Sequence, residues 1–154
     1  MKDIVSSEFL EVVYDKFLFR VQRGNLYTRD DLWLRREDSA YRVGLTDFAQ
    51  RVAGDVAFVK LASPGATLGC DETLAEIETI KTTLVVGTPT DGQVLEVNEA
   101  LTDNPERINE DPYGEGWIAL LKSADCRPLF LDADAYFALM NERLVEEDRK
   151  RQAK

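Results

Sequence analysis

The middle of the chain alternates short apolar runs with turn residues, as the strands of a β-sheet do. Residues 74–80 and 82–86 are two runs rich in β-branched and apolar side chains, and Lys81 lies between them. Pro64-Gly65 and Asp91-Gly92 supply turn signals before and after this pair. Alternation within both runs is imperfect, so it neither fixes the buried face nor excludes a short helix. The pattern predicts a mainly β fold, a small sandwich or flattened barrel, with Lys81 at the tip of a β-hairpin.

Two other segments have the pattern of helices. Thr46 is a candidate N-cap and Gly54 a terminating residue, which together predict a short helix between strands. A C-terminal helix is predicted from Asp132 onward, with basic residues in its last turn. Its apolar face is formed by Phe137, Met140 and Leu144. We expect this helix to pack on the β core.

The first 25 residues have a different pattern from the rest of the chain. Phe9, Val12, Val13 and Phe17 follow the spacing of an amphipathic helix, and residues 17–21 look more extended. We therefore expect residues 1–25 to form an N-terminal extension, mainly helical, that packs on the domain. The domain itself is expected over residues 26–131, followed by a helix and tail over residues 132–154.

The composition indicates a single globular domain without a catalytic centre. The chain has 154 residues, of which 44% are hydrophobic, and no apolar run is long enough to span a bilayer. It has no histidine, the commonest general base and metal ligand. Cys70 and Cys126 lack metal-ligand or Cys-x-x-Cys spacing, so we expect buried or idle thiols and no metal site. No secretory signal is visible at the N-terminus, which predicts a cytoplasmic protein.

The formal net charge of -10 is concentrated in one acidic segment. Residues 71–115 contain 12 acidic and 2 basic residues, whereas the rest of the chain contains 17 of each sign. This imbalance argues against nucleic acid as a partner. The acidic field either steers the segment toward basic rims on partner enzymes or only keeps the protein in solution. Both interpretations remain open at this point.

Five sequence blocks resemble those of glycine-cleavage H proteins and occur in the same order. They are residues 43–50 (VGLTDFAQ), 54–59 (GDVAFV), 78–81 (ETIK), 92–98 (GQVLEVN) and 109–117 (NEDPYGEGW). The resemblance implies a lipoyl-domain-like barrel-sandwich hybrid in which Lys81 carries covalently attached lipoic acid. It also implies a non-catalytic carrier. Biotin carriers are similar hairpin domains, but they usually flank the lysine with methionines, which Ile80 and Thr82 do not match.

The resemblance also implies partners. A lipoate-attaching enzyme would modify Lys81, and Glu78 is a candidate for recognition by that enzyme. A flavoprotein similar to dihydrolipoamide dehydrogenase would reoxidise the arm. The third partner would be either a heterodisulfide-reductase-like complex or the enzymes of glycine cleavage, and no membrane partner is expected.

Two departures from the H-protein pattern bear on the pathway. One is the N-terminal extension. The other is the block Tyr27 to Trp33 (YTRDDLW), where the family commonly reads Tyr-Thr-x-x-His-Glu-Trp. With these departures the chain looks more like the lipoate-binding proteins of bacterial sulfur oxidation, so we expect an arm that shuttles sulfur intermediates. The alternatives are a glycine cleavage H protein, which carries an aminomethyl group between decarboxylase and aminomethyltransferase, and an unmodified module that only binds partners.

Overall fold

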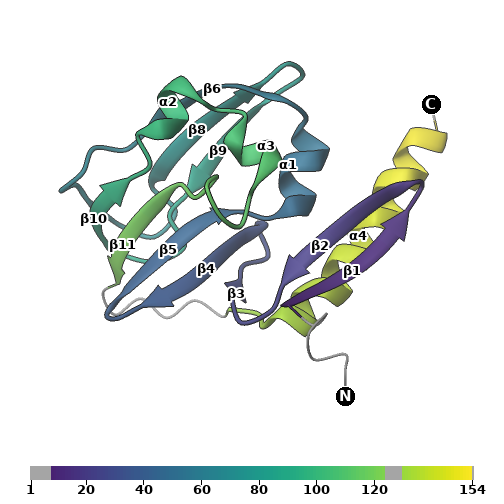
Figure 1. Cartoon of the computed structure of the whole chain (residues 1–154), viewed down its shortest axis with the longest axis horizontal. Coiled ribbons are helices and arrows are strands. Elements are labelled where there is room, and N and C mark those ends of the chain that lie inside the picture. The colour runs from purple at the N-terminus through teal and green to yellow at the C-terminus, as the bar shows by residue number, and fades with distance from the viewer. Residues whose placement is uncertain (1–7, 124–129, 154) are drawn as a thin grey trace.

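The computed structural model describes residues 8–123 and 130–153, in which the chain forms eleven strands and four helices. The strands are β1 (Phe9–Tyr14), β2 (Phe17–Gln22), β3 (Leu26–Tyr27), β4 (Leu32–Glu37), β5 (Ala40–Leu45), β6 (Val56–Leu61), β7 (Thr67–Leu68), β8 (Thr73–Thr79), β9 (Thr83–Gly87), β10 (Gly92–Val97) and β11 (Ala119–Ser123). The helices are α1 (Asp47–Ala53), α2 (Ala100–Asp103), α3 (Arg107–Glu110) and α4 (Ala133–Gln152). Figure 1 shows that strands dominate the molecule.

Two sheets enclose the main apolar core. One sheet has the strand order β3-β4-β5-β11-β10-β7, and the other has the order β6-β8-β9. Leu34 and Leu121 of the first sheet and Leu74 and Ile77 of the second belong to one cluster of almost fully buried side chains. Burial of these side chains away from water is the main force that holds the sheets together. The predicted flattened barrel or sandwich is confirmed.

The predicted helix in the N-terminal extension is wrong for the described part of that segment. Strands β1 and β2 pair as an antiparallel hairpin, with Tyr14 opposite Phe17. The turn residues Asp15 and Lys16 both have positive φ, 50° and 76°, which is the geometry that joins two strands through a two-residue turn. Phe19 and Val21 alternate inward along β2, and this period of two prevails over the helical spacing.

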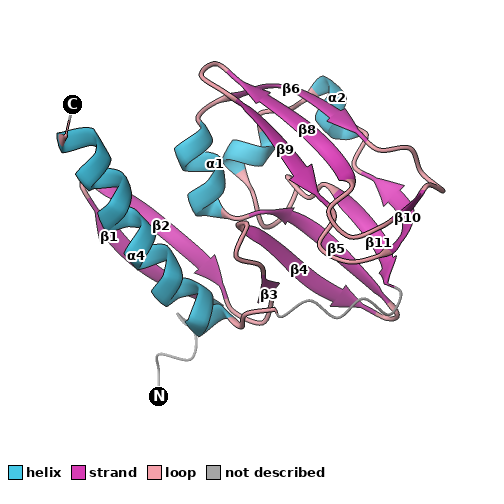
Figure 2. Ribbon diagram, turned by 180° about the vertical axis from the view of Figure 1, so that it is seen from behind, coloured by secondary structure: helices cyan, strands magenta, loops and turns pink. Residues whose placement is uncertain are grey.

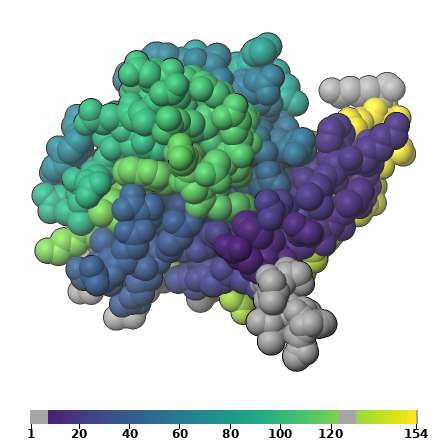
Figure 3. Space-filling model, in the orientation of Figure 1, coloured from purple at the N-terminus to yellow at the C-terminus, as the bar shows by residue number. Residues whose placement is uncertain are grey.

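The hairpin and α4 pack together at one end of the molecule. Figure 2 shows α4 lying along the hairpin, and Figure 3 shows the hairpin on the surface beside the C-terminal segment. The buried face of α4 carries Tyr136, Met140 and Leu144, so the helix packs mainly on β1, β2 and β3 and less on the main core than expected. Tyr136 stacks on Tyr27 with 4.7 Å between ring centroids.

The predicted N-cap at Thr46 is confirmed, and Asp132 at the predicted start of the C-terminal helix is an N-cap too. Thr46 Oγ1 accepts a hydrogen bond from the Ala49 amide (3.2 Å), and Asp132 Oδ1 accepts one from the Ala135 amide (2.8 Å). Each bond satisfies a backbone donor that has no partner within its helix. In the part of the chain that the structure describes, no helix is long and apolar enough to cross a membrane.

Candidate functional site

Lys81 lies in a tight turn between β8 and β9, at the predicted hairpin tip. The turn is closed by the Thr79 amide, which donates to the Thr82 carbonyl oxygen (2.8 Å). Thr79 Oγ1 accepts hydrogen bonds from the amides of Thr82 (3.0 Å) and Lys81 (3.3 Å). A threonine hydroxyl that binds neighbouring amides in this way stabilises a turn. The backbone at Lys81 is therefore held by its own turn.

The connection between α1 and β6 supports this turn from one side. The Ile80 amide donates to the Asp55 carbonyl oxygen (3.3 Å). Gly54 ends α1 with φ 94° and ψ -170°. A β-carbon at Gly54 would lie 3.3 Å from Cε of Lys81, so the lysine side chain runs close over the glycine. The sequence predicted Gly54 only as a helix terminator.

The Lys81 side chain is exposed. No carboxylate of the described residues lies within ion-pair distance of its ammonium group. The neighbouring Ile80 is 84% exposed, which is unusual for an isoleucine. Glu78 is exposed too and lies on the outer face of the sheet, between Phe58 on β6 and Thr83 on β9. The site thus presents a lysine, an apolar side chain and a carboxylate to a visiting protein.

Comparison with known proteins decides the family. The sequence model of the "Glycine cleavage H-protein" family matches residues 25–143. The chain belongs to the glycine cleavage H-protein family. A glycine cleavage system H protein of Bacteroides thetaiotaomicron is 45% identical over 117 residues, which are 75% of this chain and 93% of the relative. The Escherichia coli protein is 41% identical over 119 residues, 75% of this chain and 92% of the relative.

A solved structure leads to the same family. The crystal structure of a glycine cleavage system H protein from Mycobacterium marinum has a TM-score of 0.72 and 33% sequence identity, and the likeness covers 77% of this chain and 98% of that one. Proteins of the glycine cleavage H-protein family are carrier subunits rather than enzymes, which confirms the expected non-catalytic class. Strands β1 and β2 end before the first residue that the family model matches.

A cleft of about 1100 Å³ lies next to the turn in this family member. It includes Thr82 and follows β9, with α1 and α4 supplying other parts of its lining. Apolar side chains from several elements line it: Leu45, Phe48, Val52, Leu84 and Val86. Charged side chains of α4, among them Arg143 and Lys150, also border it. The cleft therefore combines an apolar interior with a charged rim.

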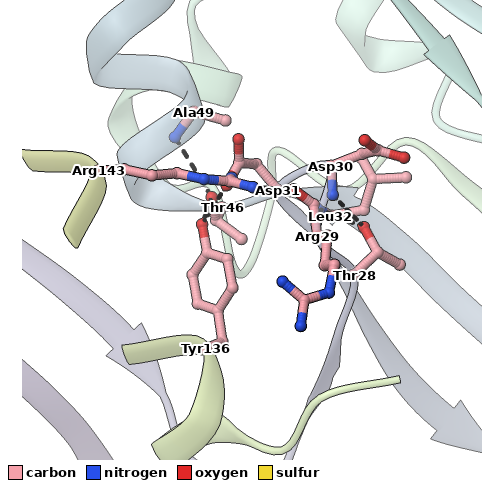
Figure 4. A network of polar contacts seen from close by, with 9 residues as sticks. All are labelled: Thr28, Arg29, Asp30, Asp31, Leu32, Thr46, Ala49, Tyr136 and Arg143. Atoms are coloured by element: carbon pink, nitrogen blue, oxygen red, sulfur yellow. Dashed lines mark hydrogen bonds and ion pairs between the residues drawn. The ribbon is translucent and has the colours of Figure 1, made fainter. Parts of the chain in front are cut away.

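The block that departs from the usual H-protein pattern anchors α4 beside this cleft. Asp31 has φ 69°, and its Oδ1 accepts hydrogen bonds from Arg143 (2.6 Å) and from the Tyr136 hydroxyl (2.8 Å) (Figure 4). Because the Tyr136 proton is directed to Asp31, Thr46 Oγ1 donates to the Tyr136 oxygen (2.8 Å). Burial raises the pKa of the Asp31 carboxyl, although Tyr136 and Arg143 act in the opposite direction. Leu32, the next residue, is buried in the core.

The two cysteines have different outcomes. Cys70 is exposed rather than buried, and its thiol donates to the Pro89 carbonyl oxygen (3.7 Å) at the rim of the cleft. Cys126 lies outside the described residues. Among the described residues, no group of three or more acidic or cysteine side chains could hold a metal ion.

The residues that support the turn could not be recognised as its support from the sequence. Gly54, Asp55 and Asn109 all lie within blocks that resemble the family. The order of these blocks indicates the family but not the contacts that the three residues make. The contact between Asp55 and Ile80 joins residues 25 positions apart, so no local pattern reveals it. The two strand-like runs and the block of residues 78–81 located Lys81. They contain no sign of the contacts that hold its turn in place.

Proposed function

We propose that the chain is the lipoyl carrier of a glycine cleavage system, with lipoic acid attached to Lys81. The observation that carries the proposal is an exposed lysine, without an ion pair to any residue that the structure describes, on a hydrogen-bonded turn in a member of the glycine cleavage H-protein family. The attached arm would carry an aminomethyl group between the decarboxylase and the aminomethyltransferase. A dihydrolipoamide dehydrogenase-like flavoprotein would then restore its oxidised form.

The arrangement of Lys81 fits such a group. A lipoyl group supplies a disulfide that becomes reduced as it accepts a cargo on one of its two sulfur atoms. Tethering it to the protein replaces a search by diffusion with an intramolecular search at high effective concentration. That advantage requires a fixed root and a free end. The bonds within the turn and the bond to Asp55 fix the root, and the exposed side chain leaves the end free.

The cleft beside β9 offers a resting place for the arm between visits. Thr82 borders the cleft and follows Lys81 directly in sequence. The hydrocarbon part of a lipoyl arm would gain free energy by leaving water for the apolar lining, which includes Phe48 and Leu84. The charged rim supplied by α4 would remain in contact with the polar end of the cargo.

The comparisons favour glycine cleavage over sulfur oxidation. The relatives compared above are all glycine cleavage system H proteins, and none of their names mentions a sulfur pathway. One observation keeps sulfur oxidation as a second candidate: where the H-protein pattern has histidine and glutamate, this chain has Asp31, which binds α4, and the buried Leu32. In that role the arm would shuttle sulfur intermediates with a heterodisulfide-reductase-like complex. The cytoplasmic location and the lack of nucleic-acid and membrane partners stay predictions.

Mass spectrometry of the intact protein from its native host tests the attachment. We expect one lipoyl-sized adduct that maps to Lys81 and disappears in the Lys81→Arg variant, which keeps the charge and the fold. Absence of the adduct on the native protein would contradict both carrier functions and favour an unmodified binding module. For the pathway, the lipoylated protein is incubated with glycine and a purified glycine decarboxylase. We expect loading with an aminomethyl group, and failure to load would favour sulfur transfer.

A further inference from the structure

The side chain of Asn109 forms three hydrogen bonds beneath the α1–β6 connection. Its Oδ1 accepts from the Val56 amide (2.9 Å), and its Nδ2 donates to the Gly54 carbonyl oxygen (3.0 Å) and to Gln50 Oε1 (2.9 Å). One amide group on α3 thus binds Gln50 in the middle of α1, the residue that ends this helix and the first residue of β6. The bonds are made from both ends of the amide, so they also fix its orientation.

The segment that Asn109 holds is the segment that supports the lysine turn. Asp55, between the two bonded residues Gly54 and Val56, accepts the hydrogen bond of the Ile80 amide. Gly54 itself lies against the aliphatic part of Lys81. A continuous series of contacts therefore runs from Asn109 through residues 54–56 to the backbone and side chain of the turn.

We propose that Asn109 is a positioning residue for the attachment of lipoate to Lys81. This proposal rests on the proposed function. The attaching enzyme must receive the turn in one arrangement, with the lysine amine at the activated acyl group. If the support is loosened, a smaller fraction of the protein has the competent arrangement, and the apparent affinity falls by that fraction. The KM for the protein substrate then rises while kcat changes little.

Asn98 provides a matched control within the same region. Its Nδ2 donates to the carbonyl oxygens of Glu115 and Trp117 (2.8 Å each), and its side chain is buried. It therefore resembles Asn109 in residue type and in donating to two partners, and it lies near the other end of the loop that follows α3. No hydrogen bond of the Asn98 side chain reaches residues 54–56 or the turn. Asn98→Ala therefore measures the effect of losing a buried amide side chain while the hydrogen bonds to residues 54–56 stay intact.

The experiment compares Asn109→Ala, Asn98→Ala and the wild-type chain as substrates of a purified lipoate-attaching enzyme supplied with lipoyl-adenylate. Loss of the anchoring bonds is expected to raise the KM of Asn109→Ala about fivefold to tenfold, since one net hydrogen bond corresponds to roughly that factor. Its kcat is expected to stay within about twofold, because a fully bound turn is held by the enzyme. Asn98→Ala is expected to match the wild type in both constants.

Hydrogen exchange of the Ile80 amide gives a second measurement that needs no enzyme. We expect faster exchange in Asn109→Ala and unchanged exchange in Asn98→Ala, because only the first variant loosens Asp55. Unchanged KM and unchanged Ile80 exchange in Asn109→Ala would overturn the proposal, and so would equal changes in both variants. If Asn109→Ala does not fold, Asn109→Asp keeps the acceptor for Val56 and removes the donor to Gly54, with the same expectations. If the attaching enzyme does not modify the wild-type protein at all, the proposed function is contradicted. The exchange rate of the Ile80 amide then still tests whether Asn109 holds the turn in position.

Discussion

The side chain of Lys81 lies across Gly54, so close that a β-carbon at the glycine would sit 3.3 Å from Cε of the lysine. The same glycine has φ 94° and ψ -170°, a conformation that is almost confined to glycine. Gly54 therefore serves three purposes at one point: it ends α1, turns the chain into β6 and leaves room for the base of the Lys81 side chain. The fit of the turn against its support depends on the absence of a side chain there.

Gly54→Ala is expected to destabilise the protein and to impair modification of Lys81. Backbone strain at this φ and ψ costs about 1 to 3 kcal/mol. The added methyl group also presses on Lys81 and displaces its side chain. Urea denaturation measures the first effect, and the rate of lipoate attachment measures the second.

Gly65→Ala is the control for backbone strain alone. Gly65 has φ 90°, and a β-carbon there would meet nothing within 4 Å. We expect a loss of stability without a change in attachment. Equal attachment rates for the two variants would contradict the role given to Gly54.

Phe19→Ala is expected to lower the free energy of unfolding by about 3 kcal/mol or more, as truncation of a buried phenylalanine does. Phe19 is 5% exposed and packs on Phe48 in a second buried cluster, which also contains Tyr27, Tyr113 and Tyr136. Leu18→Ala, on the opposite face of the same strand, is expected to change stability by less than about 0.5 kcal/mol. Leu18 is 42% exposed. Similar losses in both variants would contradict the inward alternation of β2.

The N-terminal hairpin shows where sequence patterns reach their limit. Phe9, Val12, Val13 and Phe17 fit a helical spacing, yet Asp15 and Lys16 adopt positive φ and form the turn of a hairpin. Aspartate tolerates positive φ, but Lys16 stands where such turns usually have glycine, so the familiar two-residue turn signal is absent. What stabilises the hairpin is distant in sequence. The Tyr113 hydroxyl donates to the Arg20 carbonyl oxygen, and α4 covers one side.

The lysine turn shows the opposite case. Its strands are rich in β-branched and apolar residues, and turn signals bracket them, so local preference and final structure agree. Order of sequence blocks then sufficed to predict the family and the fold. The support of the turn by Asp55 and Asn109 could not be predicted in this way, because it depends on how α1 and α3 meet in space.

Glu78→Gln is expected to slow lipoate attachment severalfold at low ionic strength without altering stability. Glu78 is exposed and lies three residues before Lys81, without an ion pair in the described part of the chain. A surface charge of this kind acts mainly on the rate of association with a partner, and salt screens the effect. Measuring kcat/KM over a series of salt concentrations checks it.

Glu76→Gln is the matched control for Glu78. Glu76 lies two residues earlier on the same strand and pairs across the sheet with Lys60 and Val85. It shares the face of Glu78 but is farther from the turn. If the two variants behave alike, the charge of the whole face matters and recognition of Glu78 in particular is refuted. If neither variant responds to salt, the acidic segment serves solubility alone.

At alkaline pH the protein is expected to unfold as the buried tyrosines of the second cluster lose their protons. Burial raises the pKa of Tyr27, Tyr113 and Tyr136 above the ordinary value of 10.0. In the unfolded chain these phenols lose their protons near pH 10, whereas in the folded chain they keep them. The stability that they contribute is therefore fully present below pH 10 and is lost as the pH rises toward their folded-state pKa values. The ultraviolet absorbance of tyrosinate should increase in one cooperative step together with loss of the near-ultraviolet circular dichroism. Gradual ionisation of all tyrosines near pH 10 with the fold intact would show that this cluster is open to water.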